Sequence, residues 1–224
     1  IHIHIYMNTH IGGVKRKKTS IKALIAVNIF TIVLAIIQGW DITLVLFIYW
    51  CQSIMIGGAT VVKMLRLKKF STEGYLIDEK PVLPTKKTKQ KSATAFIIHY
   101  GAFHAAYLFV ILNSFKEKNI PITDLLSISV IITLLFFLIN HTYSYFINRE
   151  EDEKKVKNIG TMMLFPYARI IPMHLAMMFG IHSAGIIGII IFLPLKTFAD
   201  TLMHNIEHYR KPKNIRIKKK VKSI

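Results

Sequence analysis

Six long apolar stretches occupy most of this chain, and they limit its fold more than any other feature. They cover residues 20–39, 42–65, 93–115, 124–147, 161–180 and 183–208. A helix needs about 20 apolar residues to cross the hydrocarbon core of a bilayer, and each stretch is long enough. Hydrophobic residues make up 52% of the 224 residues, and the mean hydropathy is +0.41. The sequence therefore predicts an all-α, polytopic integral membrane protein built as a six-transmembrane-helix bundle.

The charged residues lie between and beyond the apolar stretches. We expect a basic N-terminal tail at 1–19, a single six-helix membrane domain at 20–209 with a polar loop at 66–92, and a basic tail at 210–224. The charged loop at 148–158 is interpreted as a solvated extension of the fourth helix. One membrane domain accounts for the whole length.

The distribution of Lys and Arg predicts the orientation. The net charge is +18, and the tails and the loops at 66–92 and 148–158 each contain several Lys or Arg residues. The turns at 40–41 and 181–185 have no Lys or Arg, and the loop at 116–123 has two. Six helices place every strongly basic segment on one side, which the positive-inside rule makes cytoplasmic. We expect a multi-pass protein of the plasma membrane with both termini in the cytoplasm.

Composition also limits the partners. Basic segments beside a membrane attract anionic lipid headgroups. Nucleic-acid binding is not expected, because no soluble domain remains to carry a basic face. Gly57, Gly58 and Gly101 favour close helix approach and a homodimer or larger assembly. The single Cys51 excludes an internal disulfide and a cysteine-rich zinc motif. Abundant Ile and Lys with little Gln are compatible with an AT-rich, thermophilic source.

Four polar residues of the apolar stretches form the candidate site. Counted at about 1.5 Å per helical residue, His99, His174, Asp200 and His204 fall within about two turns of one level, in the cytoplasmic half. Ionisable groups inside a bilayer are costly and usually mark function. Imidazole and carboxylate suit zinc or another divalent metal, so these four are the predicted metal ligands.

Further polar residues are expected to line the same cavity or support the ligands. They are Gln52, His104, Tyr107, His141, Arg169, Lys196 and His208. Lys196 is costly inside a bilayer unless it is paired, and Asp200 at position i+4 is the expected partner. The alternative is a hydrogen-bonded proton or structural network that holds no metal.

Four strings carry a family resemblance. They are Tyr49-Trp50-Cys51-Gln52-Ser53-Ile54-Met55-Ile56-Gly57; His99-Tyr100-Gly101-Ala102-Phe103; Pro166-Tyr167-Ala168-Arg169 with His174; and Asp200, His204, Glu207 and His208. In this order they resemble the uncharacterised prokaryotic membrane family called domain of unknown function 6498, over about residues 40–210. The family tends to have Glu where Gln52 stands and His where Tyr107 stands, which implies fewer metal ligands here. The resemblance supports a site but implies no reaction.

Three functions stay open. Motifs of intramembrane zinc proteases, Ser–His hydrolases and membrane desaturases are missing. A metal-dependent lipid-modifying hydrolase would use a metal-bound water near the headgroups. A small proton or metal transporter would use the same residues as a relay. A structural or partner-binding protein would use the polar layer only to fix helix packing. Whether the chain is an enzyme does not follow from the sequence.

Overall fold

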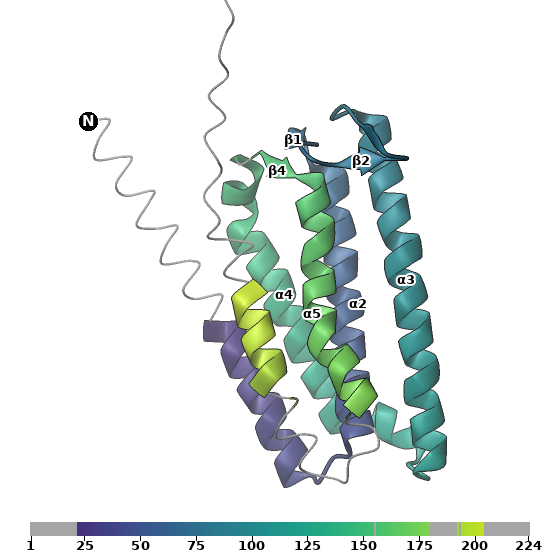
Figure 1. Cartoon of the computed structure of the whole chain (residues 1–224). Coiled ribbons are helices and arrows are strands. Elements are labelled where there is room, and N and C mark those ends of the chain that lie inside the picture. The colour runs from purple at the N-terminus through teal and green to yellow at the C-terminus, as the bar shows by residue number, and fades with distance from the viewer. Residues whose placement is uncertain (1–21, 155, 180–191, 193, 204–224) are drawn as a thin grey trace, which may run out of the picture.

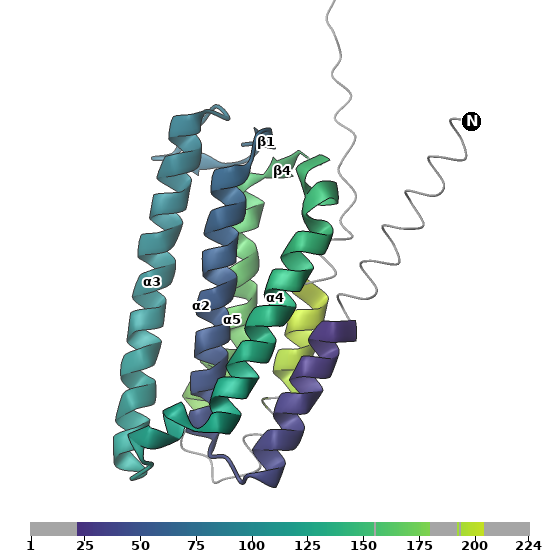
Figure 2. The ribbon, with the colours of Figure 1, turned by 180° about the vertical axis from the view of Figure 1, so that it is seen from behind.

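The chain folds mainly into helices. A computed structural model describes residues 22–154, 156–179, 192 and 194–203. Within them lie six α-helices and one 3-10 helix, and Figures 1 and 2 show the α-helices side by side. The helices are Lys22–Ile37, α2 (Ile42–Arg66), α3 (Lys86–Glu117), the 3-10 helix η1 (Ile122–Leu126), α4 (Ile128–Lys154), α5 (Ile159–Phe179) and a last helix at 194–203.

Three of these helices are long and apolar enough to cross a membrane. They are α2, α3 and the part of α4 at Ile128–Ile147. Lys22–Ile37 is also apolar but shorter. Large apolar side chains such as Ile98, Phe109, Ile139 and Leu164 are more than 60% exposed on the outer surface. An exterior of this kind suits lipid rather than water. The fold therefore indicates a multi-pass membrane protein.

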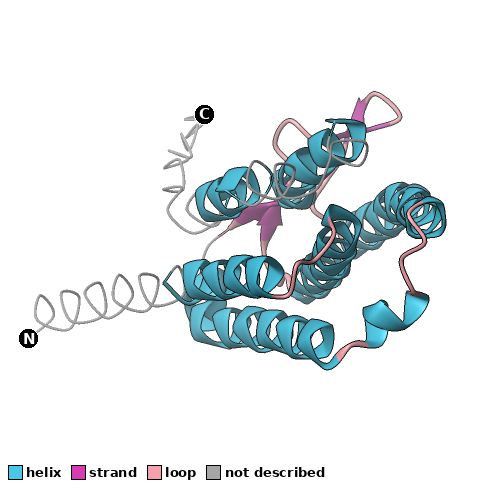
Figure 3. Cartoon of the chain, turned by 90° about the horizontal axis from the view of Figure 1, so that it is seen from below, coloured by secondary structure: helices cyan, strands magenta, loops and turns pink. Residues whose placement is uncertain are grey.

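Helix α2 is the centre of the bundle, because α3, α4 and α5 all contact it. Its Ile42, Val45 and Ile48 are fully buried. The same hydrophobic core takes Phe137 from α4 and Phe192 from near the last helix. Figure 3 shows the helices from below, gathered into one bundle. Residues of α2 can therefore reach side chains from several other helices.

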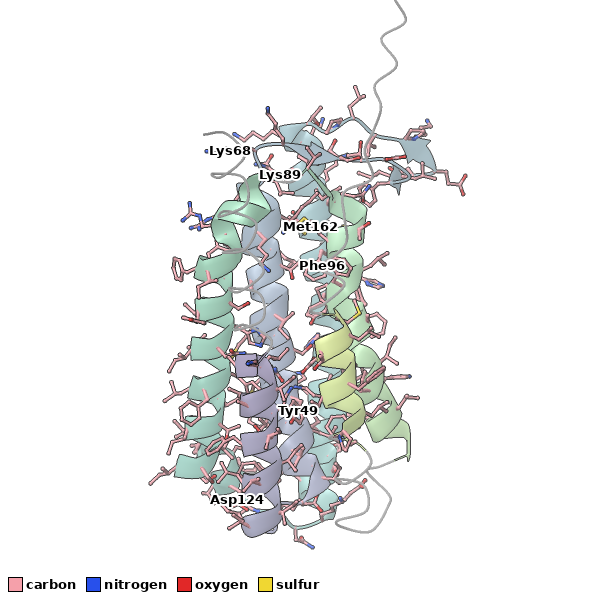
Figure 4. All side chains as sticks on the ribbon, turned by 90° about the vertical axis from the view of Figure 1, so that its left-hand side faces the viewer. Tyr49, Lys68, Lys89, Phe96, Asp124 and Met162 are labelled. Carbon is pink, nitrogen blue, oxygen red and sulfur yellow. The ribbon has the colours of Figure 1, made fainter. Side chains whose placement is uncertain are left out.

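One end of the bundle carries a small cap of short strands. β1 (Phe70–Ser71) pairs in parallel with β4 (Lys157–Asn158), and β2 (Leu76–Ile77) pairs antiparallel with β3 (Lys80–Pro81). Asp78 and Glu79 turn between β2 and β3 with positive φ angles of 52° and 62°. Figure 4 shows Lys68 and Lys89 at this end and Asp124 at the other. The two loops predicted to be cytoplasmic thus meet at one end.

Several predicted boundaries are corrected. Helix α3 begins at Lys86 rather than at residue 93, because the Thr85 side chain accepts a hydrogen bond from the Thr88 N–H and caps a polar first turn. Helix α4 begins at Ile128 rather than at 124, since η1 precedes it. The loop predicted at 66–92 is thus reduced to 67–85, and its strands were not predicted. The helical extension of the fourth helix is confirmed, because α4 runs to Lys154.

Candidate functional site

The strongest polar feature is a buried ion pair within the last helix. Lys196 and Asp200 are 5% and 2% exposed, and Lys196 Nζ lies 2.5 Å from Asp200 Oδ2. They are four residues apart, so they share one face of the helix, as the sequence predicted. Charges buried this deeply are tolerated only when they are paired and hydrogen-bonded.

Two amides from other helices complete the surroundings of the pair. Lys196 Nζ donates to Asn28 Oδ1 at 3.1 Å and to Gln52 Oε1 at 2.5 Å. Asn28 Nδ2 in turn donates to Asp200 Oδ2 at 3.5 Å. Asn28 thus contacts both charges, with its oxygen on the cation and its nitrogen on the anion. Helix Lys22–Ile37 and α2 both hold the pair in place.

Two aromatic rings also lie close to the ammonium group. Lys196 Nζ lies 3.9 Å from the centre of the Tyr49 ring and 5.1 Å from that of Phe137. Ring faces attract cations, and the attraction grows when water is excluded. Asp200 thus need not supply all of the stabilisation of the lysine charge.

A cavity of about 20 Å³ lies beside the pair. Its lining includes Tyr49, Gln52, Ser53, Lys196 and Asp200. The Tyr49 hydroxyl, on the ring labelled in Figure 4, is buried and has no hydrogen-bond partner among the described residues. A cavity of this size that has polar groups in its lining can hold about one water molecule. The site is therefore suited to a single buried water beside two charges.

Gln52 also links the pair to α4. Its Nε2 lies 3.3 Å from Nε2 of His141, which is half-buried. Further along, the Tyr145 hydroxyl accepts a hydrogen bond of 2.6 Å from Arg66 Nη1. Polar groups therefore extend along α2 and α4 from the interior towards the basic end.

A second polar group lies between α3 and α5. His99 Nδ1 is 2.8 Å from the Tyr167 hydroxyl, and His174 Nδ1 is 3.2 Å from the Tyr107 hydroxyl. The two His–Tyr pairs are reciprocal, since each helix provides one histidine and one tyrosine. Both histidines are exposed on the outside of the bundle. In each pair the tyrosine hydroxyl is hydrogen-bonded to Nδ1 of the histidine ring.

His104 lies between α2 and α3. It is 3% exposed, and its Nδ1 is 2.8 Å from the Tyr100 carbonyl, which can only accept. The Nδ1 therefore carries the proton, and Nε2 has no partner among the described residues. Trp50 Nε1 donates to the His104 carbonyl at 2.9 Å. His104 thus takes part in packing α3 against α2.

The predicted site residues fall into separate groups. Lys196, Asp200, Gln52 and His141 form one network, while His99, His174 and Tyr107 belong to the α3–α5 seam. His204, His208 and the side chain of Arg169 lie outside the described residues. The described part of the chain contains no group of three or more His, Cys, Asp or Glu that could hold a metal. A metal site that includes His204 stays a prediction.

Three residues that contact the ion pair or line its cavity were not among the site residues predicted from the sequence. They are Asn28, Tyr49 and Ser53. Asn28 is fully buried and lies 172 residues from Asp200 in the chain, so no local spacing links the two. The signal that could have found it is a lone amide within an apolar helix, which needs a polar partner.

The fold and the site together define a class: a mainly helical protein with long apolar helices and a charged network inside the bundle. The model of the Family of unknown function (DUF6498) matches residues 13–216. The chain therefore belongs to this family, as the resemblance of its sequence strings indicated. No curated protein and no solved structure matches it.

Proposed function

We propose that this chain is a six-span protein of the plasma membrane that works through a proton-exchanging site at Lys196 and Asp200. The observation that carries the proposal is an ion pair that is at least 95% buried, bonded to amides of two other helices beside a water-sized cavity. Ionisable groups at membrane depth are functional sites by default, and proton relays are among their commonest roles.

The chemistry of the pair supports proton exchange. Transfer of one proton from the Lys196 ammonium to the Asp200 carboxylate would leave a neutral amine and a neutral acid. Both states can be hydrogen-bonded by the Asn28 and Gln52 side chains, because amides donate and accept. The cavity next to the pair offers a place for the water that would bring or remove a proton.

Stability alone gives little reason for such a pair. Replacing a buried ion pair by well-packed apolar residues is often neutral or stabilising, whereas removing one partner is costly by about 3–5 kcal/mol. A pair used only for packing could therefore be exchanged for apolar side chains without loss. This comparison supplies the main control for the experiment below.

The topology in this proposal has six spans and cytoplasmic termini. It is supported by the gathering of Arg66, Lys68, Lys69, Lys86 and Lys87 at the end of the bundle that also carries β4. The opposite end includes Asp41 and Lys118, which pair with each other at 2.9 Å. The basic loops would then meet the anionic headgroups of the inner leaflet.

Proton movement can be measured with purified protein in vesicles that enclose a pH-sensitive dye. A potassium diffusion potential should drive protons inwards faster than in empty vesicles. Asp200→Asn and Lys196→Met should reduce the rate to that of empty vesicles, because each removes one partner of the exchange. Wild-type protein that gives only the rate of empty vesicles would refute the proposal.

Two control variants separate function from folding. Lys118→Met breaks the ion pair at the far end of the bundle and should leave the proton rate unchanged. The double change Lys196→Met with Asp200→Leu keeps the interior filled and should give a folded protein that moves no protons. A double variant as active as wild type would show that the pair serves packing alone.

Zinc binding is the second candidate function. It would use His204 with His99, His174 and Asp200, and elemental analysis of purified protein tests it. The proton site is better supported, because Lys196 already lies 2.5 Å from Asp200 and supplies the cation for that carboxylate. A stoichiometric metal that His204→Ala removes would favour the zinc site instead.

A further inference from the structure

The structure assigns Gln52 as a junction between Lys196 and His141. Its amide has one acceptor atom, Oε1, which holds either Lys196 or a protonated His141 but not both. The neutral His141 ring is thereby fixed with its proton on Nδ1. Protonation of this ring then controls how Lys196 is held. The inference deepens the proposed function, since it names the residue through which the buried pair is regulated.

The orientation of the Gln52 amide follows from Lys196. An ammonium group has three donors and no acceptor, so the amide atom in contact with it must be the oxygen. Gln52 Oε1 indeed lies 2.5 Å from Lys196 Nζ. The amide nitrogen therefore faces the other way, towards α4.

The state of His141 follows from Gln52. The amide nitrogen can only donate, so Nε2 of His141, 3.3 Å away, must accept. A ring nitrogen accepts only when it carries no proton, and a neutral imidazole then has its proton on Nδ1. The chain of contacts from Asp200 through Lys196 and Gln52 to His141 thus has one consistent pattern of donors and acceptors.

Protonation of His141 breaks this pattern. Both ring nitrogens then donate, and Nε2–H would meet the Gln52 amide hydrogens. If the amide turns to offer its oxygen to His141, its nitrogen meets the Lys196 ammonium instead. Either way Gln52 loses its contact with Lys196 or with His141. The contacts of Lys196 with Asn28 and Asp200 do not involve Gln52 and are kept.

Titratable groups of the described residues face this junction from three elements. Lys196 and Asp200 face it from the last helix and Tyr49 from α2, while helix Lys22–Ile37 contributes the uncharged Asn28. On α4 itself, Tyr145 lies one turn beyond His141 and bonds to Arg66. The Gln52 amide contacts both Lys196 and His141. The Gln52 variants below test whether the coupling between the two runs through this amide.

Solid-state NMR of protein with ¹⁵N-labelled histidine and lysine, in lipid bilayers, tests the inference. At a pH where His141 is neutral, its ¹⁵N shifts should show an unprotonated Nε2 and a protonated Nδ1. The signal can be assigned by its proximity to ¹³C-labelled glutamine, or by its loss in His141→Gln. An Nε2–H tautomer in the wild type would overturn the inference, and this measurement needs no folding-sensitive variant.

Two variants test the junction itself. Lys196→Met frees the amide to turn, so both neutral tautomers of His141 should appear. Gln52→Glu offers only acceptors, so Nε2 of His141 should become protonated. His104 is the internal control, because its Nδ1 proton is held by the Tyr100 carbonyl and should not change in either variant. An unchanged His141 in both variants would overturn the inference.

A pH titration tests the coupling to Lys196. The Nζ signal of Lys196 should shift at the same midpoint as His141, and in Gln52→Leu it should no longer follow. Signals that move independently in the wild type would overturn the coupling. Because these signals are read without proton transport, inactive vesicles would refute the proposed function and leave this inference standing.

Discussion

At the scale of single residues, Gly57 is the position where an added methyl group would be felt most directly. A Cβ at this position would lie 2.5 Å from Cε1 of Tyr100, whose hydroxyl bonds to Ser53. We expect Gly57→Ala to lower stability by about 1–3 kcal/mol, because the buried ring cannot move away freely. Thermal unfolding in mild detergent measures the change.

Gly58 is the matched control on the next position of α2. A Cβ there meets none of the described residues within 4 Å, so Gly58→Ala should be neutral or slightly stabilising, since alanine favours helix. Equal effects of the two changes would contradict the close contact of α2 and α3 at Gly57. Gly101 was also predicted to allow close helix approach, but a Cβ at this position would meet none of the described residues within 4 Å.

Single residues also show where prediction from sequence ends. The pairing of Lys196 with Asp200 was predictable, because both lie on one helix at i and i+4. The contacts of Asn28 and Gln52 with Lys196 join residues 168 and 144 positions apart. Helix rotation and packing decide such contacts, and hydropathy alone contains neither.

At the scale of an element, the beginning of α2 depends on one carboxylate. Asp41 caps the helix by accepting the Thr43 N–H at 2.8 Å, and it pairs with Lys118. Partial burial opposes its ionisation, but the bonds from Thr43 and the charge of Lys118 outweigh this and lower the pKa of Asp41. A lowered pKa stabilises the fold above about pH 4, and the benefit is lost as the pH falls through the folded-state value.

Asp41→Asn separates the charge from the cap, because asparagine caps helices equally well. We expect the substitution to lower stability by about 0.5–1 kcal/mol at neutral pH. As the pH falls below about 4, the variant should lose less stability than the wild type loses. Unfolding temperatures from pH 7 to 3 measure both effects. In a Lys118→Met background the change should cost less, and an equal cost in both backgrounds would show that the ion pair contributes nothing.

The limits of α3 show why element boundaries were harder to predict than element types. The apolar stretch begins near Ala93, but the helix continues back to Lys86 because Thr85 provides a cap and Lys89 donates to the Leu67 carbonyl. Hydropathy finds the part of a helix that suits a membrane, not its full hydrogen-bonded length. The pairing of β1 with β4 escaped prediction for another reason: each strand has only two residues.

At the scale of the whole molecule, hydropathy and charge were enough to predict a helical, multi-pass architecture. The helices α2, α3 and α4 each overlap one predicted stretch, since a run of apolar residues this long has few alternatives to a helix. The candidate site was harder, because shared depth does not mean shared direction. His99 and His174 each bond to a tyrosine at the α3–α5 seam, whereas Asp200 pairs with Lys196 in the interior.

The proposed topology gives the last prediction, on single cysteines introduced into a Cys51→Ser background. Lys87 and Val156 are exposed near the strand cap. Because β1 pairs with β4, both lie at the same end of the bundle, which the proposed topology makes cytoplasmic. Glu117 is exposed at the other end of α3 and should be external. In intact cells a membrane-impermeant maleimide should label Glu117→Cys, and label Lys87→Cys and Val156→Cys only after permeabilisation. Lys87→Cys and Glu117→Cys labelled from the same side would rule out α3 as a membrane span, and with it the six-span arrangement.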